Sequence, residues 1–209
     1  MIHPPGFRGA VFASAADGDG RRYEAARARL SLRLGISEEW SYPSQVHGSR
    51  VVRVSRPGSA GTADAVYTTT PDLPLAIATA DCAPVILEGP GVVGIVHAGW
   101  RGAVAGVLRA VLDAADRDGL AIERAAIGPS IRPCCYEVGR EVADRFGGHV
   151  GRTRDGGLSV DIAGYLEAQI EDLDVWRSEV CTYDSTRFHS FRRTQTEERQ
   201  VALAWIPGD

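Results

Sequence analysis

Three short segments of the chain place reactive side chains beside glycines or apolar runs: 44–48, 79–84 and 97–102. Each contributes one residue of a type that binds transition metals, namely His47, Cys82 and His97. Two imidazoles and one thiolate form a ligand set for Zn²⁺, and a fourth position left open is typical of a catalytic zinc site. The three residues therefore predict one zinc site per chain, provided that the fold brings the segments together.

The same residue types are compatible with two other kinds of site. Two histidines and one cysteine also bind copper, usually with an axial methionine, but the single methionine is Met1, so ligand supply favours zinc. Five histidines in all exclude an enzyme with several histidine-rich copper centres. Without a metal, Cys82 as nucleophile and His97 as its base would form the dyad of a thiol hydrolase or deamidase.

Two charged residues beside these segments are candidates for catalysis. Arg101 lies where a predicted strand ends and a helix begins, a junction that favours anions, and its guanidinium can hold an anion through two hydrogen bonds. Asp81 is next to Cys82 and is the nearest carboxylate in the sequence. It could move protons during catalysis, or it could accept a hydrogen bond from a ligand imidazole or a loop N–H.

Apolar patterns predict the elements that position these residues. Strands are expected at 51–54, 75–78, 84–87, 92–96, 125–128 and 201–206. The Gly-Pro-Gly turn at 89–91 predicts a hairpin that brings Cys82 close to His97. An apolar stripe predicts a helix over 104–115 that ends at Asp118-Gly119, and weaker patterns predict helices at 22–34, 139–146 and 161–170. The order of elements indicates an α/β chain of the α+β type with mixed sheets.

Length and composition exclude several classes of protein. The 209 residues carry 23 basic and 27 acidic side chains, a net charge of −4, which argues against a nucleic-acid binder. We expect a single domain over 1–209. No run of about 20 apolar residues is long enough for a transmembrane helix. With no signal peptide visible at the N-terminus, we expect a cytoplasmic protein with reduced thiols.

Three of the four cysteines lie outside the segments described above. Cys134 and Cys135 follow Pro133, and a tight turn with buried small residues is expected there rather than a vicinal disulfide. Cys181 follows an apolar residue and is expected to be buried at the end of a strand. These three residues are therefore interpreted as structural.

Taken together, the motifs resemble the laccase-domain, or YfiH-like, family. The matching blocks occur in family order over about residues 44–206 and are QVHG at 45–48, TADCAPV at 79–85, HAGWRG at 97–102, IGPSI at 127–131, CCYEVG at 134–139, CT at 181–182 and SFRR at 190–193. The resemblance implies a four-layer α/β/β/α fold with mixed sheets. It also implies that His47, Cys82 and His97 bind zinc.

The same resemblance implies a function. Members of the family are described as purine nucleoside phosphorylases that act on adenosine, inosine or methylthioadenosine with phosphate, with adenosine deaminase activity as a side reaction. An older description, multicopper polyphenol oxidase, leaves copper-dependent phenol oxidation as an alternative. Purine nucleosides and phosphate are therefore the expected partners. Nucleic acid and membranes are not expected partners. The chain is expected to be a monomer or homodimer.

The implied site can be written residue by residue. Cys82, Asp81 and Arg101 are the catalytic candidates. Gln45, Arg101, Arg192 and Arg193 are the candidates for substrate binding, with Arg101 first for phosphate. The chain departs from the family pattern at 12–19, where a shortened segment precedes a helix that lacks the family's asparagine, and at 198–200, where Glu-Arg-Gln replaces a Gly-Arg pair. The first departure predicts a changed base or sugar preference if that segment lines the pocket.

Overall fold

Two large mixed β-sheets form the centre of the computed structural model, which describes residues 1–208. The first sheet has the strand order β1 (Ala10–Phe12), β13 (Gln200–Ala204), β6 (Leu75–Thr79), β2 (Ser41–Ser44) and β4 (Gly58–Thr62). The second has the order β12 (Asp174–Arg177), β9 (Arg124–Ile127), β7 (Ala83–Gly89), β8 (Val92–Ala98), β5 (Ala65–Thr68) and β3 (Val51–Arg53). A separate hairpin joins β10 (Val150–Arg152) to β11 (Leu158–Val160).

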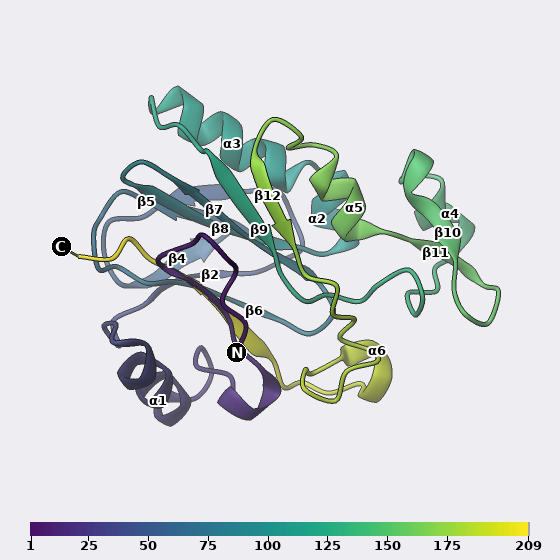
Figure 1. Ribbon diagram of the computed structural model, residues 1–209, viewed down its shortest axis with the longest axis horizontal. Helices are drawn as coiled ribbons and strands as arrows, with labels where there is room; N and C mark the ends of the chain where they lie inside the picture. The colour runs from purple at the N-terminus through teal and green to yellow at the C-terminus, as the bar shows by residue number, and fades with distance from the viewer. Residues whose placement is uncertain (209) are drawn as a thin grey trace.

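Helices cover the outer faces of both sheets (Figure 1). On the first sheet, α1 (Glu24–Leu34) packs Leu30 against residues of β1, β6 and β13. On the second sheet, the outer layer contains α2 (Trp100–Val104), α3 (Val107–Arg117) and α5 (Ile162–Glu167). The chain is therefore a four-layer α/β/β/α structure, which confirms the expected fold class.

The two sheets pack face to face through a shared apolar core. Phe12 and Ile77 of the first sheet belong to the same cluster as Ile86 and Ile95 of the second. Burying one such side chain stabilises the fold by roughly 1.5–3 kcal/mol. Because β7 and β8 are covered on both faces, their sequences are continuous apolar runs rather than alternating ones.

The predicted hairpin is confirmed. Strands β7 and β8 pair antiparallel, with Ala83 opposite Ala98 and Pro84 opposite His97. This register places Cys82, the residue before β7, beside the end of β8 that carries His97. The predicted hairpin therefore also places two candidate ligands, Cys82 and His97, next to each other.

The helix expected over 104–115 is interrupted in the structure. Gly106 adopts a left-handed conformation with φ of 80°, so the segment forms two helices, α2 and α3. Of the three weaker helices, the one expected at 22–34 forms as α1, while those expected at 139–146 and 161–170 are shorter, as α4 (Arg140–Ala143) and α5.

Other elements are too short or too polar for their patterns to predict. They are β1, β2, β4, β5, β10, β11 and β12, the 3₁₀ helices η1 (Ala15–Asp17) and η2 (Gly147–His149), and α6 (Phe191–Thr194). For example, β4 has the sequence Gly-Ser-Ala-Gly-Thr, which contains no large apolar residue. Its place in the sheet depends on pairing with β2 rather than on its own propensity.

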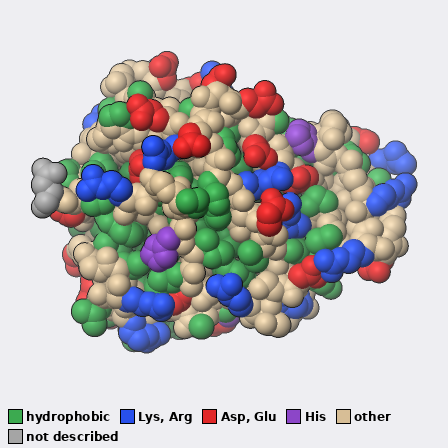
Figure 2. Space-filling model, viewed as in Figure 1, with side chains coloured by type: hydrophobic (Ala, Val, Ile, Leu, Met, Phe, Trp, Pro, Cys, Tyr) green, Lys and Arg blue, Asp and Glu red, His purple; other side chains and the backbone are tan. Residues whose placement is uncertain are grey.

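The surface mixes both signs of charge. On the face shown in Figure 2, basic side chains, all of them arginines, are interspersed with acidic ones. This distribution agrees with a nearly balanced chain. Within residues 1–208, no helix has the length and apolar character needed to cross a membrane.

Candidate metal centre and active site

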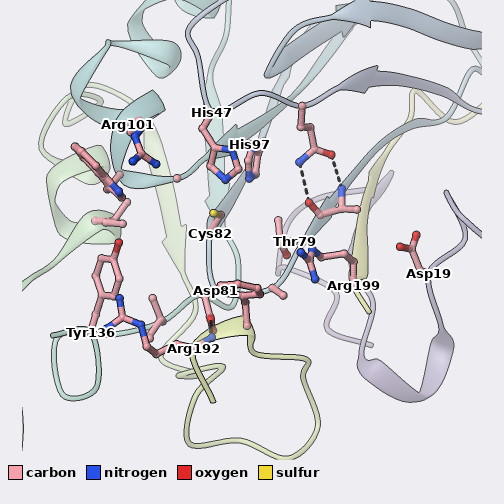
Figure 3. A pocket seen from close by; sticks show the side chains of 18 of the residues that line it. Asp19, His47, Thr79, Asp81, Cys82, His97, Arg101, Tyr136, Arg192 and Arg199 are labelled. Carbon is pink, nitrogen blue, oxygen red and sulfur yellow. Dashed lines mark hydrogen bonds between the residues drawn. The ribbon is translucent and has the colours of Figure 1, made fainter. Parts of the chain in front are cut away.

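The structure brings His47, Cys82 and His97 together at one end of the second sheet (Figure 3). His47 follows β2, Cys82 lies in the turn between β6 and β7, and His97 lies near the end of β8. One ligand atom of each residue lies within 4.8 Å of the other two. The two imidazole rings meet edge to face, with 4.8 Å between their centroids. Three segments that are distant in sequence therefore present two ring nitrogens and one sulfur to a common point.

A buried carboxylate, Asp64, holds two of these segments. The Nδ1 atom of His97 lies 2.8 Å from Asp64 Oδ1, and the backbone N–H groups of His47 and Gly48 donate to the same carboxylate at 2.9 and 2.7 Å. Burial alone would raise the pKa of Asp64, but hydrogen bonds from His97 and from the backbone N–H groups of Gly48 and Val46 outweigh it and lower the pKa. An ionised Asp64 accepts the Nδ1–H of His97 and so leaves its Nε2 free to bind a metal.

Asp64 was not predicted from the sequence, although it is central to the cluster. It comes directly before β5, a strand that the apolar pattern did not reveal. The backbone fixes it as well, since the N–H of His97 donates to the carbonyl of Asp64 at 2.7 Å. The one signal that could have indicated it is a carboxylate at the start of the Ala-Val-Tyr-Thr run at 65–68.

Two glycines of the 97–102 segment make room for the cluster. A Cβ on Gly99 would lie 2.7 Å from His47 Cδ2 and 3.0 Å from Cys82 Sγ. A Cβ on Gly102 would lie 2.9 Å from the carbonyl oxygen of Gly48. Because the His47 segment passes this close to the start of α2, neither position tolerates a side chain without displacing the ligands.

Cys82 and His97 each stabilise the charged form of the other. Burial would raise the pKa of the Cys82 thiol, but the charge on His97 and hydrogen bonds from His47 and His97 outweigh it and lower the pKa to about 6. Burial would likewise lower the pKa of His97, but the charge on Cys82 and the Asp64 hydrogen bond raise it to about 9. At neutral pH the sulfur is therefore a thiolate, which is the form that binds metals and attacks electrophiles.

The donor set fits a divalent transition metal. Two nitrogens and one thiolate sulfur match the ligand types of zinc and of copper, and the carboxylate behind His97 is the usual partner of a metal-binding imidazole. All three residues also line a cavity, so a fourth coordination position would face this space. The geometry fits a metal site that stays accessible to a reactant.

The cavity has a volume of about 660 Å³ and is rich in arginine. This volume lies within the range of about 300–1,000 Å³ that is usual for small-molecule sites. The cationic side chains in its wall are Arg21, Arg22, Arg101, Arg192 and Arg199, against two carboxylates, Asp19 and Asp81. Trp100, Tyr136 and Phe191 add aromatic surface. In a chain of net charge −4, five arginines around one cavity indicate an anionic ligand.

Asp81 uses both carboxylate oxygens to hold another part of the wall. Oδ1 accepts a hydrogen bond from the Thr182 hydroxyl at 2.7 Å, and Oδ2 accepts one from the backbone N–H of Arg192 at 2.7 Å. Its own backbone is left-handed, with φ of 91°, a strained conformation for a residue other than glycine. Of the two roles considered from sequence, the hydrogen bond to a loop N–H is the one that the structure contains.

Arg192 and Arg193, the neighbouring candidates for substrate binding, have different surroundings. Arg192 lines the cavity, donates to the Glu137 carbonyl at 2.7 Å and lies over the Tyr136 ring, 5.0 Å from its centroid. Arg193 is not part of the cavity wall within residues 1–208. Its guanidinium donates to backbone carbonyls of Thr182, Tyr183, Ser185 and Phe188. In the structure its donors hold a loop, and the role of Arg193 in substrate binding stays a prediction.

Gln45 and Arg101 both reach the cavity. The Gln45 amide pairs with the backbone of Ala78 at 2.8 and 2.9 Å and also accepts a hydrogen bond from Arg21, so it anchors that arginine to β6. Arg101 is exposed and lies over the Trp100 ring, 4.6 Å from its centroid. Arg101 is the guanidinium on the 97–102 segment itself, next to the candidate ligands (Figure 3).

Tyr136 is a further cavity residue that sequence reasoning treated only as part of a motif. Burial, followed by the nearby charge of Cys82, raises the pKa of its phenol to about 12. It therefore stays protonated at neutral pH and can donate a hydrogen bond. Arg21, Arg22 and Arg199 were likewise not predicted to line the site, because their segments reach it only through the packing of the first sheet.

The fold and the cluster together define a four-layer α/β protein with a histidine–cysteine metal-type centre at an arginine-lined cavity. A family model described as multi-copper polyphenol oxidoreductase laccase matches residues 8–207. The chain belongs to this laccase-like, or YfiH-like, family.

Two relatives, each from a bacterium, carry the same functional name. A Deinococcus radiodurans protein named purine nucleoside phosphorylase is 38% identical over 202 residues, covering 90% of this chain and 79% of that protein. An Aquifex aeolicus protein of the same name is 35% identical and covers 78% of this chain and 81% of that protein. This similarity supports an enzyme of the purine nucleoside phosphorylase type.

Solved structures share the fold. YlmD from Geobacillus stearothermophilus aligns with a TM-score of 0.87 and 27% identity, covering 98% of this chain and 94% of that one. The Bacillus licheniformis protein YfiH aligns with a TM-score of 0.85 and 24% identity, covering 94% and 92%. Both comparisons establish the architecture over nearly the whole chain.

Proposed function

We propose that the protein is a zinc-dependent purine nucleoside phosphorylase that converts adenosine, inosine or methylthioadenosine and phosphate to the free base and a sugar 1-phosphate. One observation carries the proposal: the His47, Cys82 and His97 cluster opens onto a cavity whose wall combines five arginines with aromatic rings. An anion subsite beside apolar surface is what binding a nucleoside together with phosphate requires.

Different side chains of the site have different roles in the proposed reaction. His47, Cys82 and His97 would hold the zinc, which supplies a Lewis acid at the cavity wall when bound. Arg101 binds the phosphate through paired N–H donors and orients it toward the sugar. Tyr136, with its phenol protonated, donates a hydrogen bond to a purine nitrogen. The aromatic rings of Trp100 and Phe191 offer faces on which the base can stack.

Phosphorolysis is the main reaction of this proposal, and adenosine deamination a side reaction. Deamination needs a carboxylate free to move protons. Both oxygens of Asp81 already accept hydrogen bonds from Thr182 and Arg192, so we assign Asp81 a positioning role. It keeps the Arg192 end of α6 against the turn that carries Cys82.

The test is an assay of base release with and without phosphate. We expect hypoxanthine from inosine and adenine from adenosine or methylthioadenosine only when phosphate is present, with loss of activity after zinc is removed by a chelator and recovery after zinc is restored. Inosine formed from adenosine without phosphate would measure deamination. Metal-replete protein that releases no base from any of the three nucleosides would contradict the proposal.

A second candidate function rests on the line of contacts from Cys82 through His97 to Asp64. A thiolate, an imidazolium and an orienting carboxylate are the parts of a cysteine hydrolase or deamidase that needs no metal. This reading predicts protein that is active without metal and loses that activity when Cys82 is alkylated. The phosphorylase reading predicts one zinc in this cluster and protection of Cys82 by that zinc.

Copper-dependent phenol oxidation is tested in the same preparation. Two histidines and one cysteine also suit copper, and the family model carries an oxidoreductase description. After copper loading we expect phenol oxidation to be slower than nucleoside turnover by the zinc form. The reverse ranking would favour the oxidase.

A further inference from the structure

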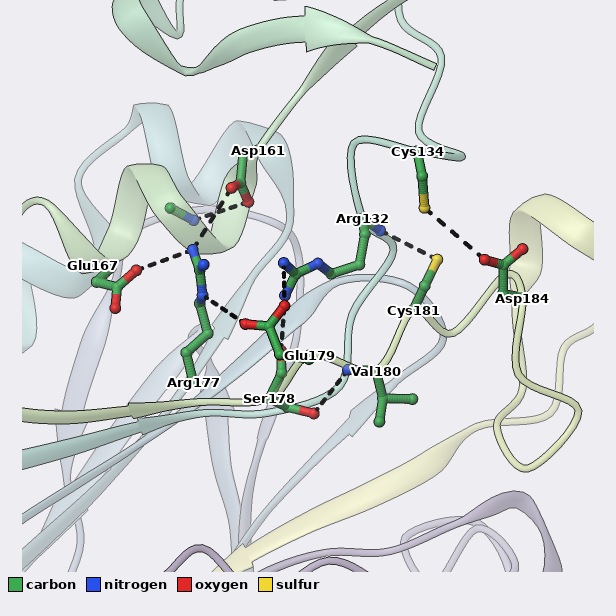
Figure 4. Close-up of polar contacts among 11 residues, drawn as sticks. Arg132, Cys134, Asp161, Glu167, Arg177, Ser178, Glu179, Val180, Cys181 and Asp184 are labelled. Carbon is green, nitrogen blue, oxygen red and sulfur yellow. Dashed lines mark hydrogen bonds and ion pairs between the residues drawn. The ribbon is translucent and has the colours of Figure 1, made fainter. Parts of the chain in front are cut away.

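A second cluster of ligand-type side chains lies outside the cavity wall. Cys134 and Cys135, in the turn after Pro133, face Cys181 and Asp184 from the segment after β12. The sulfurs of Cys134 and Cys135 are 3.2 Å apart, and they lie 4.0 and 3.5 Å from oxygens of Asp184. One ligand atom from each of the four residues lies within 4.8 Å of all the others. Figure 4 shows Cys134, Cys181 and Asp184 turned toward one point.

The spacing of these atoms is close to that around a tetrahedral ion. With bonds of about 2.3 Å to sulfur and about 2.1 Å to oxygen, neighbouring ligand atoms around zinc are roughly 3.5–3.8 Å apart. The two sulfurs are 3.2 Å apart, a little closer than this, and they lie 4.0 and 3.5 Å from the two different oxygens of Asp184. All the cysteines are free thiols, so three sulfurs converge here without a disulfide. Thiols are weak hydrogen-bonding partners, and mutual contacts alone offer little reason for such a convergence.

Nearby groups can offset the negative charge of these ligands. Arg154 pairs with both oxygens of Asp184, and the backbone N–H of Arg132 donates to Cys181 Sγ at 3.4 Å. Three thiolates and one carboxylate around a divalent cation would leave a net negative charge, which Arg154 reduces. Soft sulfur ligands favour zinc or copper(I) over magnesium or calcium, and the tetrahedral set with one oxygen favours zinc.

We propose that Cys134, Cys135, Cys181 and Asp184 form a second zinc site, structural rather than catalytic. Its four positions are all filled by the protein, and none of the four residues belongs to the cavity wall within the part of the chain that the structure describes. The site is separate in residues and in position from the His47 cluster, and it does not depend on the proposed function.

The ion would join two loops that build the cavity. Tyr136 directly follows Cys135, and Thr182, which hydrogen-bonds Asp81, directly follows Cys181. The backbone already links the second loop to Ser130, because the Thr182 N–H donates to its carbonyl at 3.0 Å. A metal bridge between the two loops therefore fixes the wall that holds Tyr136 and Arg192.

Counting metal per chain tests the proposal. We expect two zinc ions in protein produced with zinc and purified without metal-affinity resin. Two variants should each keep one: His47→Ala with Cys82→Ala, which removes donors of the first cluster, and Cys135→Ser, which removes a donor of the second. Combining all three substitutions should leave none. The pair of single-cluster variants are matched controls for each other, since each removes a thiol from one cluster and leaves the other intact.

Cobalt(II) gives a readout that does not depend on the folding of Cys135→Ser. Loaded into the His47→Ala, Cys82→Ala variant, cobalt should produce strong sulfur-to-cobalt charge-transfer absorption and the visible bands of a tetrahedral ion. One zinc in the native protein together with no cobalt absorption in this variant would overturn the proposal. So would an intact mass short of two hydrogens that reduction restores, because it reports a disulfide. Copper(I) bound in preference to zinc would overturn the choice of metal.

Discussion

The two clusters use similar residues in different surroundings. His47, Cys82 and His97 supply nitrogen and sulfur, lie in the wall of a large cavity and have a buried carboxylate behind them. Cys134, Cys135, Cys181 and Asp184 supply sulfur and oxygen, lie outside that wall and have Arg154 against their carboxylate. Ligand types alone do not separate a reactive centre from a structural one. The two kinds of centre differ instead in the access that a reactant has to them and in the charges around their donors.

The largest expected effect comes from removing Cys82, the sulfur donor of the first cluster. Cys82→Ala should lose the zinc of this cluster and reduce phosphorolysis to background, because the variant keeps only two of the three donors. Metal analysis and the base-release assay measure the two losses. Cys135→Ala is the control and should keep the first zinc. Full phosphorolysis by Cys82→Ala would contradict the assignment of the first cluster as the reactive centre.

Arg101→Ala separates anion binding from metal binding. Removing one donor that stabilises a developing charge typically costs about 10²-fold or more in rate, so we expect a fall in kcat of that order with zinc still bound. Steady-state kinetics in varied phosphate and metal analysis check both parts. Arg109→Ala, an exposed arginine of α3 paired with Asp113 at 2.8 Å, is the matched control and should change neither. Loss of zinc from Arg101→Ala would refute the assigned role.

Asp64→Asn tests whether the carboxylate behind His97 sets the affinity of the first cluster. Replacing such a partner typically weakens metal binding by about 10- to 100-fold. Competition against a coloured chelator measures the affinity. Asp118→Asn, which alters a carboxylate bonded to Arg53 and Tyr67, should leave it unchanged. Equal affinity for Asp64→Asn and the native protein would contradict the positioning role.

Thiol reactivity in metal-free protein contrasts the clusters over pH. The pKa of Cys82 is lowered to about 6, so its thiolate forms as pH rises through that value, and its alkylation rate should increase about 10-fold from pH 5 to pH 7 before levelling off. Burial and contacts with Cys134 and Cys181 raise the pKa of Cys135, so it should stay unreactive over this range. Peptide mass spectrometry after timed alkylation distinguishes the two. A Cys82 rate that still climbs above pH 8 would contradict the stabilisation of its thiolate by His97.

The smallest expected effect is at Tyr136. One neutral hydrogen bond is worth roughly 0.5–1.5 kcal/mol, so Tyr136→Phe should raise KM for the nucleoside by about 2- to 12-fold and leave the zinc content unchanged. Tyr165→Phe is the control, since that ring packs on Phe146 at 4.9 Å outside the cavity wall. An unchanged KM in Tyr136→Phe would remove the phenol from the proposed substrate contacts.

Much of the fold followed from local patterns, and part of it did not. The continuous apolar runs of β7 and β8 and the turn between them identified the hairpin, because strands buried on both faces need apolar residues throughout. The helix over 104–115 was predicted as one piece, whereas the left-handed backbone at Gly106 divides it. Short edge strands such as β4 and β12 carry no comparable pattern, since pairing with a neighbour decides them.

Some residues of the candidate site were likewise predicted from local patterns, and others were not. Residue types at 47, 82 and 97 were enough to name candidate ligands, because few side chains bind transition metals and the hairpin sets two of them side by side. The contacts of Asp64, the hydrogen bonds of Asp81 and the positions of Arg21 and Arg199 were not predicted, since each joins segments that are distant in sequence. Arg193 was expected at the substrate from its residue type and motif, whereas in the structure four loop carbonyls hold its guanidinium.

The sequence by itself determined the donor chemistry, the central hairpin and the family, because these depend on residue identity and on neighbours along the chain. Only the tertiary structure decided which donors share a point, which carboxylate lies behind His97 and which arginines face the cavity. It also brought three cysteines that had been interpreted separately as structural into one group with Asp184. Such groupings depend on the packing of the sheets and loops, which no local pattern encodes.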